Sequence, residues 1–247
     1  MQYRSESTKK TYEVHLRLYL KWLDGRKQDA RNAQEYIDHM LDSGRKPNYI
    51  ATAANALRAH WKDGGKALSL HAPTPEVGYP KYLTIDQIYK LLASAKTALE
   101  KCILTLLFDT GARISEVLNL HLEDINLEER LLHVTRKGGR EEDVLLGEKG
   151  QQALEIWLKT RKSKDKRVFM DYTYNDIYYI LKETAKRAGI ENFAPHMLRH
   201  SLAFYMLSKG KDLHDIQEIL GHRSIATTAN IYARRKPEHL RKVKPDW

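Results

Sequence analysis

The side chains best suited to chemistry lie in short stretches that share one pattern, an arginine with a polar partner three residues away. Arg113 and Glu116 have this spacing in TGARISEVLNL, and His196 and Arg199 have it in HMLRHSLAFYML. Residues three apart lie on the same face of a helix. Each pair alone is more typical of an exposed contact, which stabilises a protein little. The alternative is an arginine held by its partner so that the guanidinium can bind a phosphate.

Three further residues stand out: Lys137 in a glycine-containing turn, His222 in LGH and Tyr232 in NIY. Each has an ordinary explanation, as a solvated loop lysine, a cation at a helix end and a packing tyrosine. Together with two arginines and His196, however, they are the groups that a metal-free phosphoryl transfer needs. Arginines neutralise the charge of the transition state, and histidine and lysine move protons near neutral pH. A tyrosine supplies an oxygen nucleophile that stays covalently attached.

The sequence motifs of competing chemistries are missing. The chain has no HExxH motif, no CxxC pair and no GxxxxGK[ST] loop, so neither a zinc site nor a P-loop is predicted. The carboxylates form no obvious set for two-metal catalysis. We therefore expect no metal and no cofactor.

The composition points to a polyanionic partner. The 247 residues include 42 Lys or Arg and 32 Asp or Glu, a formal net charge of +10. Such an excess is typical of nucleic-acid binding, with solubility alone as the simpler alternative. The single cysteine, Cys102, cannot form an internal disulfide, and the N-terminus shows no secretory pattern. No apolar run reaches the roughly 20 residues of a membrane span. We expect an intracellular, cytoplasmic protein without a membrane partner.

Helical periodicity dominates the first part of the chain. Residues 7–24, 30–43 and 48–62 each carry apolar side chains at helical spacing. In the first two helices we expect these side chains to face inward: Tyr12, Leu16, Tyr19, Leu20, Leu23, Tyr36, Ile37, Met40 and Leu41.

A proline-rich stretch divides the chain. Three prolines within eight residues disfavour regular structure in 71–82. We predict a linker there, between a helical domain at 1–70 and a second domain at 83–247 that ends in a basic tail.

The second domain begins with a helix signal at Thr84, where Gln87 completes a capping-box pattern. Two apolar helices follow. In 131–146 the pattern changes to two β-prone runs around Gly-Gly, which predicts a hairpin. Helical patterns then resume over 150–162, 173–188, 196–209 and 212–220. The predicted fold class is mainly α (α+β), with one small antiparallel sheet in the second domain.

The motifs TGARISEVLNL, RKGGREEDVLL, HMLRH, LGH and NIY occur in an order and at a spacing that resemble the tyrosine recombinase (phage integrase) family. The resemblance extends over nearly the whole chain and is closest to the compact two-domain Xer-type members. It implies an N-terminal helical bundle of the SAM-like, core-binding type and a C-terminal catalytic domain.

The resemblance also implies a role for each residue. Arg113 and Arg199 would bind the scissile phosphate, and Tyr232 would attack it to give a 3′-phosphotyrosyl DNA. Lys137 would protonate the leaving 5′ oxygen, although the hairpin is more acidic than is usual and Arg136 and Arg140 remain alternatives. The supporting roles implied are proton transfer for His196, a phosphate hydrogen bond for His222, orientation of the site for Glu116 and a structural part for His200.

The activity implied is site-specific recombination of double-stranded DNA, by a tetramer assembled on inverted half-sites. Off DNA the protein would be a monomer or a weak dimer. Two alternatives stay open: a type IB topoisomerase that relaxes supercoils as a monomer, and a DNA-binding protein of the same fold without catalysis.

Overall fold

The computed structural model describes residues 6–75, 80–136 and 139–221. The chain divides into two compact units, Met1–Gly78 and Tyr79–Trp247. The division falls inside the stretch 71–82 that the sequence marks as a linker. Lys137, His222 and Tyr232 lie outside the described residues.

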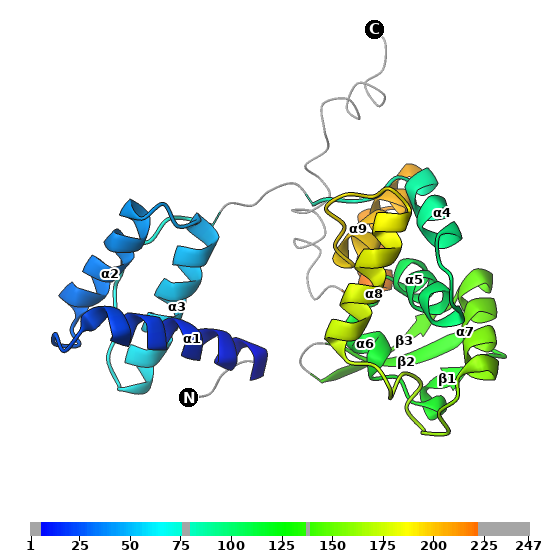
Figure 1. Cartoon of the computed structure of the whole chain (residues 1–247), viewed down its shortest axis with the longest axis horizontal. Helices are drawn as coiled ribbons and strands as arrows, with labels where there is room; N and C mark the ends of the chain where they lie inside the picture. The colour runs from blue at the N-terminus through cyan, green and yellow to red at the C-terminus, as the bar shows by residue number, and fades with distance from the viewer. Residues whose placement is uncertain (1–5, 76–79, 137–138, 222–247) are drawn as a thin grey trace, which may run out of the picture. The chain divides into compact units, whose positions relative to one another are not determined.

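The first unit contains three helices, α1 (Glu6–Leu23), α2 (Ala30–Asp42) and α3 (Pro47–Asp63) (Figure 1). Their shared core includes Leu16, Tyr19 and Leu23, whose spacing places them on one face of α1. The predicted burial of two residues is wrong, because Leu20 is 54% exposed and Leu41 is 43% exposed. His15, which precedes Leu16 on α1, is buried although it was not among the expected core residues.

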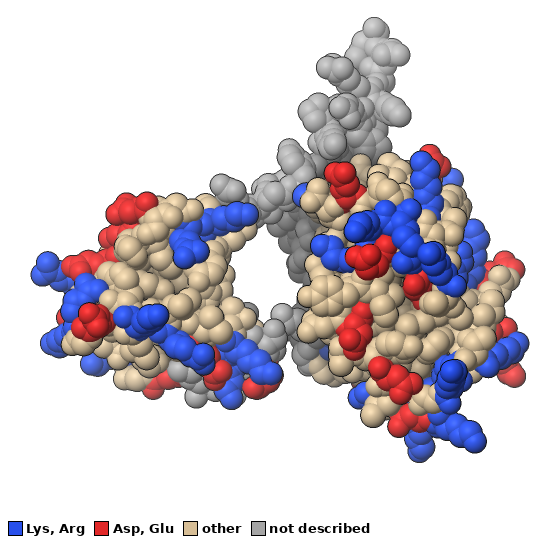
Figure 2. Space-filling view, viewed as in Figure 1, with Lys and Arg blue, Asp and Glu red and all other residues tan. Residues whose placement is uncertain are grey.

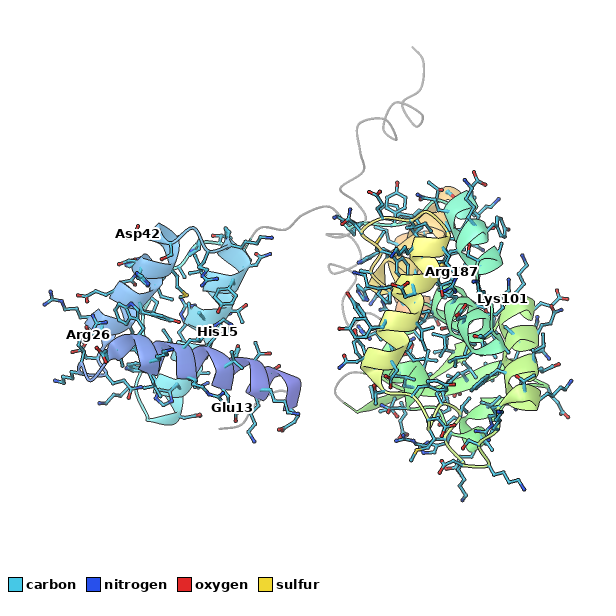
Figure 3. The ribbon with its side chains drawn as sticks, viewed as in Figure 1. Glu13, His15, Arg26, Asp42, Lys101 and Arg187 are labelled. Carbon is cyan, nitrogen blue, oxygen red and sulfur yellow. The ribbon has the colours of Figure 1, made fainter. Side chains whose placement is uncertain are left out.

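His15 is an unusual core residue. It lies on α1 (Figure 3), and its ring lies edge-on to Tyr49 of α3, with 4.7 Å between the ring centroids. Its Nδ1 atom is buried without a hydrogen-bond partner. Burial lowers the pKa of His15, because the charged imidazolium would lose its hydration.

The second unit combines helices with a small sheet (Figure 1). Its elements are α4 (Ile85–Ala93), α5 (Ala98–Thr110), α6 (Ile114–Leu118), a 3-10 turn (Leu122–Asp124), β1 (Ile125–Asn126), β2 (Leu131–Arg136), β3 (Arg140–Leu145), α7 (Glu148–Thr160), α8 (Tyr174–Arg187), α9 (His196–Ser208) and α10 (Leu213–Leu220).

Helix α5 is the centre of this unit. It packs against α4, α6, α7, α8 and α9, and most of its side chains are buried because its sequence is rich in apolar residues. Cys102 is fully buried in it. Side-chain caps define several helix starts, and the predicted capping box of Thr84 and Gln87 is confirmed at α4.

The sheet has the order β1–β2–β3 with antiparallel neighbours. The predicted hairpin is confirmed as β2 and β3, with Leu132 opposite Val144 and Arg136 opposite Arg140. The two-residue strand β1 was not predicted, since so short a segment shows no alternation. In Figure 1 the sheet lies at one end of the unit beside α6, which β2 contacts. The expected mainly helical fold with a small antiparallel sheet is confirmed.

Candidate active site

The turn between α5 and α6 places Arg113 and Glu116. Gly111 ends α5 with φ +63°, a left-handed conformation that favours glycine. Arg113 is the N-cap of α6, and its backbone N–H donates to Glu116 Oε2 at 2.9 Å. The Arg113 guanidinium donates to Glu116 Oε1 at 2.5 Å. The arginine is thus half-buried and held by its partner, whereas an exposed ion pair was the alternative.

Glu116 is 4% exposed and also pairs with a residue of the hairpin. Arg136, at the end of β2, donates from one NH group to Glu116 Oε2 at 2.9 Å and from Nε to Glu142 Oε2 at 3.2 Å. Arg140 donates to the same Glu142 oxygen at 2.5 Å. Both hairpin arginines are therefore committed to ion pairs.

The charges around Glu116 keep it ionised. Burial raises its pKa, but the hydrogen bond from the Arg113 N–H and the positive charges of Arg136 and Arg113 outweigh burial, so the net pKa lies below its ordinary value.

Arg199 is a buried residue of α9, with 2% of its surface exposed. One NH group donates to the carbonyl of Gly111 at 2.6 Å, and the other donates to the carbonyl of Leu220 at 2.5 Å. These bonds join α9 to the turn after α5 and to the end of α10. The alternative of an exposed contact is therefore wrong for this arginine.

His196 is the first residue of α9, and it is exposed on one side. Partial burial lowers its pKa, and the charges of Arg199 and Arg113 lower it further, against the opposing charge of Glu116. A neutral imidazole is therefore favoured near neutral pH, and it can accept a proton. The ring of His200 lies edge-on to His196, with centroids 4.8 Å apart.

The end of α10 packs against the hairpin arginine and glutamate of this site. Gly221 is the predicted C-cap, with φ +60°. A Cβ atom at Gly221 would lie 2.7 Å from Glu142 Oε2 and 3.0 Å from Arg136 Nε. Arg136 also donates to the carbonyl of Ile219 at 3.4 Å. The residue that precedes His222 is thus packed against the hairpin.

The structure therefore brings together Arg113, Glu116, His196, Arg199 and His200 of the candidate set. Sequence reasoning missed the central place of Arg136 and Glu142. A signal was present, because Leu132, Val134 and Arg136 alternate along β2 and so share its buried face.

The described residues contain neither a metal-binding cluster nor a membrane-spanning helix. No group of three or more His, Cys, Asp or Glu side chains there could hold a metal ion. None of the helices in this part of the chain is long and apolar enough to cross a membrane.

Comparison with known proteins identifies the family. The model of the phage integrase family matches residues 81–239. Tyrosine recombinase XerA from Pyrococcus horikoshii is 32% identical over 252 residues, which cover 97% of this chain and 87% of the relative. Tyrosine recombinase XerD from Listeria monocytogenes is 29% identical, covering 91% and 86%.

A solved structure, the Tn1549 transposon integrase in complex with transposon right end DNA, has the same fold. Its TM-score is 0.75 at 18% identity, over 97% of this chain and 93% of the other. The resemblance seen in the sequence motifs is confirmed, and the chain belongs to the phage integrase family, whose matched relatives are tyrosine recombinases.

Proposed function

We propose that this protein is a site-specific DNA recombinase that cuts and rejoins strands through Tyr232 without a metal or cofactor. The observation that carries the proposal is the bond from Arg199 to the Gly111 carbonyl, which brings the arginine of α9 beside the turn that holds Arg113. Two guanidiniums from distant segments in one place suit a phosphodiester and its more negative transition state.

In the cleavage step the phenolic oxygen of Tyr232 attacks the scissile phosphorus, and the bond to the 5′ oxygen breaks. Neutral His196 assists removal of the phenolic proton, and Lys137 gives a proton to the leaving 5′ oxygen. The products are a 3′-phosphotyrosine and a free 5′ hydroxyl. His222 adds a hydrogen bond to a non-bridging oxygen of the phosphate.

In the rejoining step a 5′ hydroxyl from the partner duplex attacks the phosphotyrosine and releases Tyr232. One phosphodiester replaces another, so no ATP is required. Arg113 and Arg199 hold the phosphate in both steps, while Glu116 and His200 support their positions.

The ligand proposed is double-stranded DNA with inverted half-sites, bound inside the cell by both units. Lys and Arg side chains are numerous on the visible surface of each unit, mixed with Asp and Glu (Figure 2). The net charge of +10 also supports DNA as the partner. The Tn1549 integrase was solved with DNA, which supports the same ligand class here.

We further propose a tetramer on DNA, from a monomer or weak dimer off DNA, with segment 233–247 docking on a neighbouring subunit. Deleting 236–247 should then abolish pairing of two DNA sites while a single site is still bound. Pairing that survives the deletion would contradict this part.

Recombination separates the proposal from its rivals. A site is first selected from random duplexes by binding to the protein, and two copies are placed in one supercoiled plasmid. The proposal predicts excision or inversion of the segment between the copies. Relaxation of plasmids with no such site would favour a type IB topoisomerase, and binding without any strand cleavage would favour a silent DNA-binding protein.

A further inference from the structure

The carboxylate of Glu116 lies between two guanidiniums that differ in exposure. Arg113 contacts Oε1 at 2.5 Å with 34% of its side chain exposed, and Arg136 contacts Oε2 at 2.9 Å with 4% exposed. The proposed phosphate site thus has one accessible arginine and one buried arginine on the same anion.

The number of guanidiniums on Glu116 decides the net charge that Arg113 presents to a phosphate. An arginine paired with one glutamate forms a neutral pair, which attracts a phosphate only weakly. A second guanidinium on Glu116 leaves a net positive charge at the accessible end. Glu142 does not cancel that gain, because it also pairs with Arg140 at 2.5 Å. Together the cluster has three guanidiniums and two carboxylates.

We propose that Arg136 is a positioning residue, a buried counter-cation that lets Glu116 hold Arg113 without neutralising it toward the scissile phosphate. This inference rests on the proposed function, in which Arg113 binds that phosphate. Arg136 acts through Glu116, since the other bonds of its guanidinium go to Glu142 and to the Ile219 carbonyl.

The first test varies the charge of the scissile phosphate. Arg136→Met should slow formation of the covalent protein–DNA adduct by about 100-fold, the scale of losing one transition-state donor. Duplex affinity should stay within roughly threefold, because the guanidinium of Arg136 is bound to the carboxylates of Glu116 and Glu142 and not to the DNA. With a neutral methylphosphonate at the scissile position, the difference between the variant and the wild type should shrink to about threefold. An equal loss on both substrates would overturn the inference.

The second test is a suppressor. In the Arg136→Met background, Glu116→Gln removes the negative charge that neutralises Arg113. The double variant should form the adduct about tenfold faster than Arg136→Met alone. A purely structural role for Arg136 predicts the opposite, since the second substitution would remove another hydrogen bond. A double variant as slow as the single one, or slower, would overturn the inference.

A folding defect is handled by a further variant. If Arg136→Met shows no cooperative thermal transition, Arg136→Met with Glu142→Met takes its place, because an apolar pair can replace a buried ion pair with little loss of stability. It removes the same counter-cation and should show the same dependence on substrate charge. An equal loss on both substrates in this variant would also overturn the inference.

Failure of the proposed function would look different, because the wild type itself would form no adduct. The inference would then be decided by sulfate binding, followed through the Arg113 Nε–H signal in NMR titrations. Sulfate should bind the Arg136→Met protein about tenfold more weakly than the wild type. Equal affinities would overturn the inference.

Discussion

Gly111 allows a quantitative test, because its replacement has two separable costs. Its φ of +63° costs an alanine about 1–2 kcal/mol. A Cβ atom there would also lie 2.6 Å from Leu220 Cδ2 and 3.1 Å from Leu202 Cδ2. Both leucines belong to a buried cluster, so they cannot move without disturbing it, and overpacking of this kind costs about 1–3 kcal/mol. Gly111→Ala should therefore destabilise the second unit by about 2–5 kcal/mol.

Gly210 provides the matched control. Its φ is +79°, but no atom lies within 4 Å of a Cβ placed there. Gly210→Ala should therefore have only the conformational cost of about 1–2 kcal/mol. The assay is native-state hydrogen exchange in urea, with the free energy of opening taken from the amides of α5. If Gly111→Ala destabilises α5 no more than Gly210→Ala does, the tight contact between this turn and α10 is refuted.

Three further predictions concern single interactions and the net charge. Ser201→Ala should cost about 1–3 kcal/mol, measured in the same exchange assay, because the Leu83 N–H that donates to Ser201 Oγ at 2.8 Å loses a buried acceptor; an unchanged stability would contradict this. The pKa of His15 is lower in the folded state, so the unfolded state binds more protons as pH falls below about 6.5, and opening of α1 should become easier there. His15→Leu should remove this pH dependence and the exposed His71→Leu should keep it; equal slopes in both variants would refute the assignment. DNA affinity should fall at least about 100-fold between about 50 and about 200 mM salt, and a flat response in a binding titration would argue against phosphate contacts.

Much of the fold follows from local sequence signals, and the errors have physical causes. The helices were predicted because apolar side chains recur at helical spacing, and α4 also has its capping box. Leu20 and Leu41 share the helical spacing of the core side chains, but they lie at the edges of the apolar stripes and are exposed. A single leucine at an edge can remain exposed at little cost, so periodicity does not decide its burial.

The candidate site was less accessible to sequence reasoning than the fold. The spacing of Arg113 and Glu116 allowed both an exposed pair and a buried one, and only the hairpin packed on α6 decides between them. Arg136 was considered as a substitute for Lys137, whereas it occupies the buried face of β2. Its burial depends on Glu116, which is distant in the sequence. Local patterns contain no information on such a pairing.

The most direct test of the account is the covalent bond between Tyr232 and DNA. A nicked duplex carrying the selected site, which traps the cleaved strand, is incubated with the protein in EDTA and resolved on a denaturing gel. The account predicts an adduct with the wild type and none with Tyr232→Phe, at equal binding of both proteins to the site. An adduct that survives the substitution would assign the nucleophile to another residue, and its absence from the bound wild type would contradict recombinase chemistry.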